Sequence, residues 1–210
     1  MTDRLDAHAQ IIDRYRRVAH LPDGLFFFTF PLRRHAVRRL GLVAGGSVLE
    51  VGCGSGANFP YLLQAVGPAG RVVGVDLSPD MIAAARARVH RHAWSRIELV
   101  ESAAESLRLD EQFDALLLFA MHDVFTSPDG LDRCLAHVRS GGRVVAVGPV
   151  LAAGRLGRVL NPVLGAVFRR FAVSSLDRDQ PWRLLSERIP ALHVERFGPG
   201  VLFMAWGEVS

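Results

Sequence analysis

The sequence predicts an α/β fold in which a mostly parallel sheet of seven strands carries helices on both faces and ends in an antiparallel hairpin. Two observations lead to this prediction. Short apolar runs alternate with helix-length segments from residue 47 to residue 147, and such alternation is typical of parallel sheets. Near the C-terminus, two strand-like runs flank the turn Gly198-Pro199-Gly200, which indicates the hairpin.

Seven runs of apolar and β-branched residues have the length of strands. The first leads directly into a glycine-rich turn, and the second is followed by Asp76. The fourth has a continuous apolar centre, Ala115-Leu116-Leu117-Leu118, as expected for a strand buried on both faces. The predicted strands are 48–51, 71–75, 97–100, 113–119, 143–147, 192–197 and 201–206.

Two helix starts are marked by capping residues. Ser78-Pro79-Asp80 combines an N-cap, a first-turn proline and an early acid. Ser127-Pro128 opens a second helix, which we predict to end at Ser140-Gly141-Gly142. Apolar residues at helical spacing predict further helices at 8–20, 33–40, 57–66, 151–171 and 181–188.

Length and composition indicate one globular domain. The chain has 210 residues, half of them apolar, so we expect a single domain over residues 1–210, with an N-terminal helical lid (1–40) and a helical insert (150–175). Cys53 and Cys134 match neither a metal site nor a disulfide framework, which predicts a cytoplasmic location and no metal. No apolar run has the length of a membrane span, and residues 1–10 lack the apolar core of a signal peptide.

The positive charge is concentrated outside the predicted sheet. The whole chain carries a net charge of +4, and residues 1–40 and 150–175 each have four more arginines than acids. The second region has Arg155, Arg158, Arg169 and Arg170 along a predicted helix with an apolar face. A basic amphipathic helix suits an anionic membrane surface, although it could also pack on the sheet or form a dimer face.

The segment from Ser47 to Asn58 is the centre of the predicted site. It joins a buried strand to a helix through glycines at 52, 54 and 56, which lets backbone N–H groups approach a ligand closely. Residues 52–57 match the dinucleotide fingerprint G-x-G-x-x-A, but other adenosine cofactors fit the same turn. Asp76, after the second strand, could accept bonds from two ribose hydroxyls, or it could be a simple turn residue.

Glu50 favours a cationic cofactor over a dinucleotide. Its carboxylate lies two residues before the first glycine, where it would repel a pyrophosphate and attract a sulfonium compound that carries an ammonium group. A nicotinamide-dependent dehydrogenase is therefore a distant alternative.

Four motifs in order resemble those of the class I S-adenosylmethionine-dependent methyltransferases. Residues 48–56 (VLEVGCGSG) resemble motif I, and residues 73–81 (VGVDLSPDM) resemble the second-strand motif. Residues 113–115 (FDA) and 135–143 (LAHVRSGGR) resemble the entries to the fourth and fifth strands. The resemblance covers about 45–150 and the C-terminal tail, and it implies a Rossmann-like fold that binds S-adenosylmethionine and releases S-adenosylhomocysteine.

The resemblance also implies which residues bind the cofactor. Glu50, Gly52 and Gly54 correspond to positions around its methionine portion, Asp76 to the ribose position, and Leu77 and Met81 to positions near adenine. Many relatives have an Asp where this chain has Ala103, so Ser102 or a backbone group must accept from the adenine amine here. The implied cofactor-binding set is Glu50, Gly52, Cys53, Gly54, Asp76, Leu77, Met81, Ser102, Ala103, Ala104 and Phe119.

Two residues are candidates for catalysis. His122, in the run Phe119-Ala120-Met121-His122-Asp123 after the fourth strand, could accept a proton near neutral pH, or it could be a polar loop residue. Tyr15 lies in a segment that resembles the N-terminal Tyr-x-x-x-Ala-x-x-Tyr-Asp segment of bacterial phospholipid N-methyltransferases and quinone C-methyltransferases, but it could also be a core residue. Pro22 stands where the relatives have the second Tyr of that segment, so this chain has no counterpart for the role of that Tyr.

These resemblances lead to a ranked set of functions. The first is N-methylation of a membrane lipid headgroup amine, such as phosphatidylethanolamine, by a protein bound peripherally to the inner face of the membrane. The second is C- or O-methylation of a quinone or another lipophilic aromatic molecule. The third is an inactive, cofactor-binding partner subunit. Nucleic acid is not expected as a substrate, because the Asn/Asp-Pro-Pro-Tyr motif for base amines is missing from the sequence.

Overall fold

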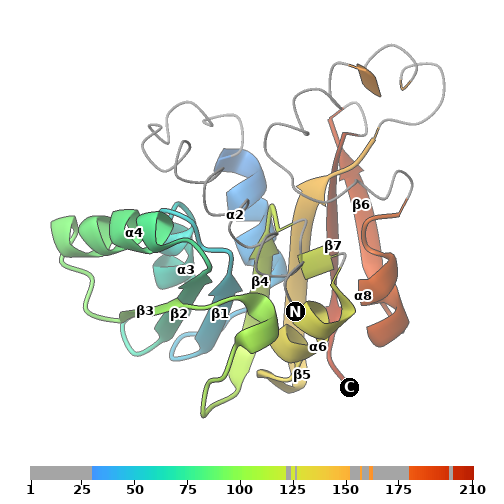
Figure 1. The fold of residues 1–210 in the computed structure, drawn as a ribbon. Coiled ribbons are helices and arrows are strands. Elements are labelled where there is room, and N and C mark those ends of the chain that lie inside the picture. Colours follow the sequence, from blue (N-terminus) through green and yellow to red (C-terminus); the bar gives the residue numbers. More distant parts are fainter. Residues whose placement is uncertain are drawn as a thin grey trace.

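Seven strands form one sheet in the order β3-β2-β1-β4-β5-β7-β6 (Figure 1). The computed structural model describes residues 30–121, 124–125, 127–151, 157, 161–162, 180–198 and 201–210. β1 to β5 are parallel, β7 runs antiparallel to β5, and β6 pairs antiparallel with β7. The predicted mostly parallel sheet and its C-terminal hairpin are therefore confirmed. The strands are β1 (Ser47–Val51), β2 (Arg71–Asp76), β3 (Ile97–Glu101), β4 (Phe113–Phe119), β5 (Val138–Pro149), β6 (His193–Phe197) and β7 (Leu202–Glu208).

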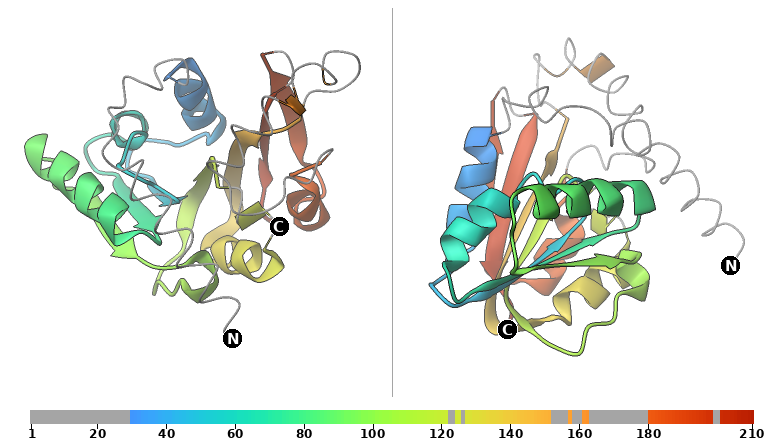
Figure 2. Two further views of the ribbon diagram at one scale, coloured as in Figure 1. Left: turned by 45° about the horizontal axis from the view of Figure 1, so that its top comes forward. Right: turned by 90° about the vertical axis from the view of Figure 1, so that its left-hand side faces the viewer.

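Helices cover both faces of the sheet, and each face has its own apolar cluster. One cluster joins the sheet to α2 (Phe30–Arg39), α3 (Phe59–Val66) and α4 (Pro79–Arg91). The other joins it to α6 (Pro128–Leu135), α8 (Arg183–Arg188) and the short 3₁₀ helix η2 (Ala104–Ser106). In Figure 2, α2 and α3 lie on the opposite side of the sheet from α6. The two clusters arise because successive strand residues point to opposite faces.

Both predicted helix caps are present. The Ser78 hydroxyl accepts a hydrogen bond from the Met81 N–H at the start of α4, and the Ser127 hydroxyl accepts one from Gly130 N–H at the start of α6. Each bond satisfies a backbone donor that has no partner within the helix. The sequence signals at these two positions thus predicted the helix starts correctly.

The connection between α6 and β5 differs from the prediction. α6 ends at Leu135 rather than at residue 140, and β5 begins at Val138 rather than Arg143. Val138 pairs with Phe113 ahead of a register irregularity, and the regular ladder resumes where Arg143 pairs with Ala115. Gly141, with φ of 73°, lies within this irregular part. The two glycines, which the sequence suggested as a helix end, therefore lie inside a strand whose pairing is irregular there.

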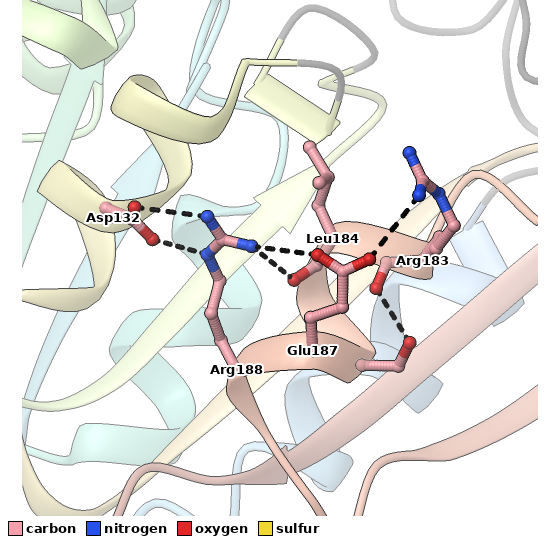
Figure 3. A network of polar contacts seen from close by, with 6 residues as sticks. Asp132, Arg183, Leu184, Glu187 and Arg188 are labelled. Carbon is pink, nitrogen blue, oxygen red and sulfur yellow. Dashed lines mark hydrogen bonds and ion pairs between the residues drawn. The ribbon is translucent and has the colours of Figure 1, made fainter.

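A surface ion pair connects α6 to α8 (Figure 3). The Arg188 guanidinium donates from Nε and Nη2 to the two carboxylate oxygens of Asp132, the second bond measuring 3.1 Å. Arg188 Nη1 also donates to the Leu184 carbonyl at 3.1 Å. The hydrogen bonds that Asp132 accepts from Arg188 lower the pKa of the Asp132 carboxyl from its ordinary value.

No helix in the part of the chain that the structure describes is long and apolar enough to cross a membrane. The predicted helices at 8–20 and 151–171 lie almost entirely outside the described residues, so the lid and the insert remain predictions.

Candidate functional site

The turn after β1 lies against the end of β2. The backbone N–H groups of Gly52 and Cys53 both donate to the Val75 carbonyl, at 2.7 and 2.9 Å. Gly52 and Gly54 have φ of 75° and 53°, in the left-handed region that residues with a Cβ rarely adopt. The turn is therefore held tightly in a conformation that favours glycine.

The two glycines have different surroundings. A Cβ built on Gly52 would lie 1.8 Å from Met121 Sδ, so the Met121 side chain covers this glycine closely. A Cβ built on Gly54 would meet only Met81 Sδ, at 3.9 Å, among the described residues. Within the described part of the chain, Gly54 therefore borders open space, as expected for a backbone segment that a ligand approaches.

Asp76 bridges the end of β2 and the glycine turn. Its Oδ2 accepts a hydrogen bond from Gly54 N–H at 2.8 Å, and its Oδ1 accepts one from Ser78 N–H at 2.9 Å. Burial raises the pKa of the Asp76 carboxyl, while the backbone donors oppose this shift. Asp76 is partly exposed, so its oxygens keep lone pairs for ligand hydroxyls.

Glu50 is completely buried in the middle of the sheet. It lies on β1 between Gly74 of β2 and Leu117 of β4, and its side chain is 0% exposed. Its Oε1 accepts a hydrogen bond from Asn58 Nδ2 at 2.5 Å, whereas its Oε2 has no hydrogen-bond partner among the described residues. Burial raises the pKa of this carboxyl to about 8. A buried oxygen without a partner is costly unless a ligand satisfies it.

Arg33 of α2 extends the polar contacts of Glu50 toward the surface. Its Nη1 donates to Asn58 Oδ1 at 2.8 Å, and its guanidinium carbon lies 4.4 Å from the centre of the Phe119 ring. The sequence predicted a helix at 33–40 in a basic region but no role in the site for Arg33 or Asn58. The only local signal was an amide eight residues after Glu50, at the N-terminus of the helix that follows the turn.

The segment after β3 lies beside Asp76. The Ser102 N–H donates to the Asp76 carbonyl at 3.0 Å, and the Ser102 hydroxyl donates to the Ala103 carbonyl at 2.9 Å. The hydroxyl oxygen remains able to accept from an adenine amine. Glu105 is a poor substitute for the missing Asp, because its Oε1 accepts from the Ser127 hydroxyl at 2.9 Å.

Several predicted cofactor residues contribute apolar surface. Met81 and Ala104 are buried, and Leu77 is half-buried beside the end of β2. The side chains of Cys53 and Phe119 belong to the apolar cluster shared with α2 and α3, so Cys53 borders the turn mainly through its backbone. Burial also raises the pKa of the Cys53 thiol, which keeps it protonated.

The end of β4 contains a strained backbone position. Ala120 has φ of 62°, and its N–H donates to the Val147 carbonyl at 2.7 Å, which holds this conformation. The next residue, Met121, is the one that covers Gly52. The catalytic candidates Tyr15 and His122 lie outside the described residues, as do Arg155, Arg158, Arg169 and Arg170, so their roles remain predictions.

The described donors and acceptors fit S-adenosylmethionine. The unpartnered oxygen of Glu50 suits an ammonium group, and Asp76 suits vicinal hydroxyls. Gly54 leaves room for the backbone to approach the ligand. A pyrophosphate would bring negative charge, and no cation, close to the buried carboxyl of Glu50, so a dinucleotide fits less well.

Comparisons with known proteins find methyltransferases among the similar sequences. Residues 48–142 match the family described as "Methyltransferase domain". The chain is 26% identical to the ubiquinone/menaquinone biosynthesis C-methyltransferase UbiE of Hahella chejuensis, over 69% of this chain and 56% of that protein. It is 34% identical to the aklanonic acid methyltransferase DauC of Streptomyces sp. (strain C5), over 62% of this chain and 60% of that protein. The matches thus span less than two thirds of these relatives.

A solved structure shares the fold. The S-adenosylmethionine-dependent methyltransferase from Aquifex aeolicus superposes with a TM-score of 0.62 at 17% identity, covering 85% of this chain and 89% of that one.

Proposed function

We propose that this chain, whose residues 48–142 match a methyltransferase domain family, is an S-adenosylmethionine-dependent methyltransferase that methylates a quinol or another electron-rich, lipophilic aromatic molecule, most directly at a ring carbon. The observation that carries this proposal is the set of named activities among the relatives. Two of them act, by name, in quinone biosynthesis and on aklanonic acid. These names support an aromatic acceptor over the lipid headgroup amine that the sequence alone favoured.

The residues of the site have separate roles in this proposal. Bound S-adenosylmethionine supplies an electrophilic methyl group on its sulfonium. Glu50 binds the cofactor's ammonium group, and Asp76 binds the ribose hydroxyls. Ser102 or the backbone beside it accepts from the adenine amine. Together these contacts would hold the cofactor so that its methyl group can be aligned with the acceptor.

Methylation of a ring carbon also requires a proton acceptor. The new bond forms between the methyl carbon and the ring carbon, the bond to sulfur breaks with its electron pair left on sulfur, and the ring then loses a proton. His122 or Tyr15 is the proposed acceptor of this proton, directly or through water.

The test is an assay with methyl-labelled S-adenosylmethionine. The protein is incubated in parallel with a short-chain demethylated quinol, with phosphatidylethanolamine vesicles and with total lipid extract. We expect label in the quinol or in an aromatic lipid of the extract. Label confined to phosphatidylethanolamine would replace this proposal with headgroup N-methylation, and S-adenosylhomocysteine binding without any transfer would favour the inactive subunit. Asp76→Asn is the control for the cofactor site, and it should weaken S-adenosylhomocysteine binding about 10- to 100-fold because it removes a charged acceptor.

Peripheral membrane contact is a further part of the proposal, because a lipophilic acceptor resides in the bilayer. The basic residues at 155, 158, 169 and 170 are its proposed contacts. Sedimentation with anionic vesicles should carry the protein down at low salt and release it at high salt. Equal sedimentation with neutral and anionic vesicles would contradict an electrostatic contact.

A further inference from the structure

Three polar side chains connect helix α2 to the centre of the sheet. Arg33 donates to Asn58 Oδ1 at 2.8 Å, and Asn58 Nδ2 donates to Glu50 Oε1 at 2.5 Å. These contacts fix the orientation of the amide, because the reversed amide would turn its oxygen toward the carboxylate and its NH₂ toward the guanidinium. The positive group at the surface end therefore determines which atom of Asn58 faces Glu50.

Asn58 does not cap α3 with its side chain, although it occupies the N-cap position. It occupies the N-cap position of α3, where an Asn side chain commonly accepts from a backbone N–H of the first turn. Here it has helical backbone angles, and its side chain makes no capping hydrogen bond. The side chain is 2% exposed and is directed to Glu50 and Arg33 instead. The Asn58 side chain therefore serves as a partner of Glu50 and not as a cap for the start of α3.

One oxygen of Glu50 is left for a cation among the described residues. Among the described residues, Arg33 of α2 faces it as the favourable charge, whereas Asp76 of β2 and the Cys53 thiol in the turn are the other titratable groups. Asn58 occupies Oε1 and brings no charge, so Oε2 remains buried without a partner. A cationic group that reaches Oε2 would gain both a hydrogen bond and an ion pair in a water-poor site.

We propose that Asn58 and Arg33 are positioning residues for Glu50: Asn58 holds the carboxylate with Oε2 directed at the cofactor's ammonium group, and Arg33 holds Asn58. This inference rests on the proposed cofactor. It makes α2 part of the cofactor site, and it predicts that binding near neutral pH ionises Glu50 and releases a proton.

The experiment measures S-adenosylhomocysteine binding by calorimetry between about pH 6 and pH 9, in two buffers of different ionisation enthalpy. The second ligand is 5′-methylthioadenosine, which contains the adenosine part but lacks the ammonium group. The variants are Asn58→Ala, Arg33→Met and Arg33→Lys. Arg34→Met is the matched control, because Arg34 is the neighbouring exposed arginine of the same helix.

The wild-type protein should release about one proton near pH 7 on binding S-adenosylhomocysteine. Asn58→Ala should bind it about 10- to 100-fold more weakly, as expected for loss of a buried hydrogen bond to a charged group, and with a changed pH profile. Arg33→Met should show a smaller loss of about 3- to 10-fold, with partial recovery in Arg33→Lys. All variants should bind 5′-methylthioadenosine like the wild type.

Three outcomes have distinct meanings. Unchanged affinity and proton release in both Asn58→Ala and Arg33→Met would overturn the inference. Equal losses for 5′-methylthioadenosine would also overturn it, because the residues would then support the fold rather than Glu50. If the wild-type protein binds neither ligand, the proposed cofactor itself is wrong.

Discussion

Two carboxylates have opposite surroundings: Glu50 on β1, next to the glycine turn, and Asp132 on α6, at the contact with α8. Glu50 is completely buried, and one of its oxygens has no partner among the described residues. The Asp132 side chain is 58% exposed, yet both of its oxygens accept from the Arg188 guanidinium (Figure 3). The pKa of Glu50 is raised to about 8 by burial, whereas the pKa of Asp132 is lowered by its hydrogen bond to Arg188.

This difference is expected if Glu50 is completed by a ligand, as proposed, whereas Asp132 serves the fold alone. An ion pair at the surface contributes little but is complete without any further molecule. A buried carboxyl that is half satisfied weakens the free protein and becomes favourable only when a cation arrives. The surrounding sheet, with its two apolar clusters, keeps Glu50 in place despite this cost.

The largest expected effect is that of Gly52→Ala. The added methyl group would collide with Met121 and would force a left-handed backbone on alanine, so we expect a loss of about 3 kcal/mol in the free energy of unfolding. S-adenosylhomocysteine binding should also be abolished. Chemical denaturation and calorimetry measure the two effects.

Gly54→Ala is the matched control, because its methyl group would meet only Met81 at 3.9 Å among the described residues. It should cost about 1 kcal/mol of stability, from the left-handed backbone alone, while still obstructing the ligand. If Gly54→Ala destabilises as much as Gly52→Ala, the open space at Gly54 is not a ligand site.

The next effect is a change in how the free energy of unfolding depends on pH when Glu50 is replaced in Glu50→Gln. An unfolded Glu loses its proton near pH 4.5, but the folded carboxyl keeps it until about pH 8. The folded protein therefore holds one more proton within this range, and its stability falls as pH rises through it. Glu50→Gln should remove this slope and be more stable at pH 7, by on the order of 3 kcal/mol as an upper bound, while binding S-adenosylhomocysteine more weakly.

Thermal or denaturant unfolding at about pH 4.5, 7 and 8.5 measures the difference between Glu50→Gln and the wild type. Asp76 is present in both proteins, so the difference between them measures Glu50 together with its electrostatic coupling to Asp76. A difference that does not change with pH would contradict the assignment of the slope to Glu50.

The smallest expected effect is that of Asp132→Asn. The pKa of Asp132 is lowered in the folded protein, so its contribution is present above its unfolded pKa and is lost as pH falls through the folded value. This sign is opposite to that of Glu50. Because the pair is exposed, the loss should be only about 0.5 kcal/mol at neutral pH, with unchanged S-adenosylhomocysteine binding. A double-mutant cycle with Arg188→Met isolates the pair, and a coupling near zero would leave the contact without a stabilising role.

The sequence by itself determined the order of strands and helices, the caps at Ser78 and Ser127, and the place of the glycine turn and Asp76. These features depend on residues within a few positions of one another, which is the range over which periodicity and capping act. The prediction from local sequence that a helix ends at Gly141-Gly142 was wrong. There the pairing of Val138 with Phe113 extended β5 over residues that resemble a helix end.

Only the tertiary structure determined the burial, the hydrogen-bond partners and the protonation state of Glu50. Its complete burial follows from the strands on either side of it, and its contact with Arg33 runs through Asn58, which is 25 residues from Arg33 in the sequence. The covering of Gly52 by Met121 joins the ends of two strands that are neighbours only in the sheet. Desolvation and hydrogen bonding depend on distance in space, so a pattern along the chain can identify the acid but not its charge state or its partners.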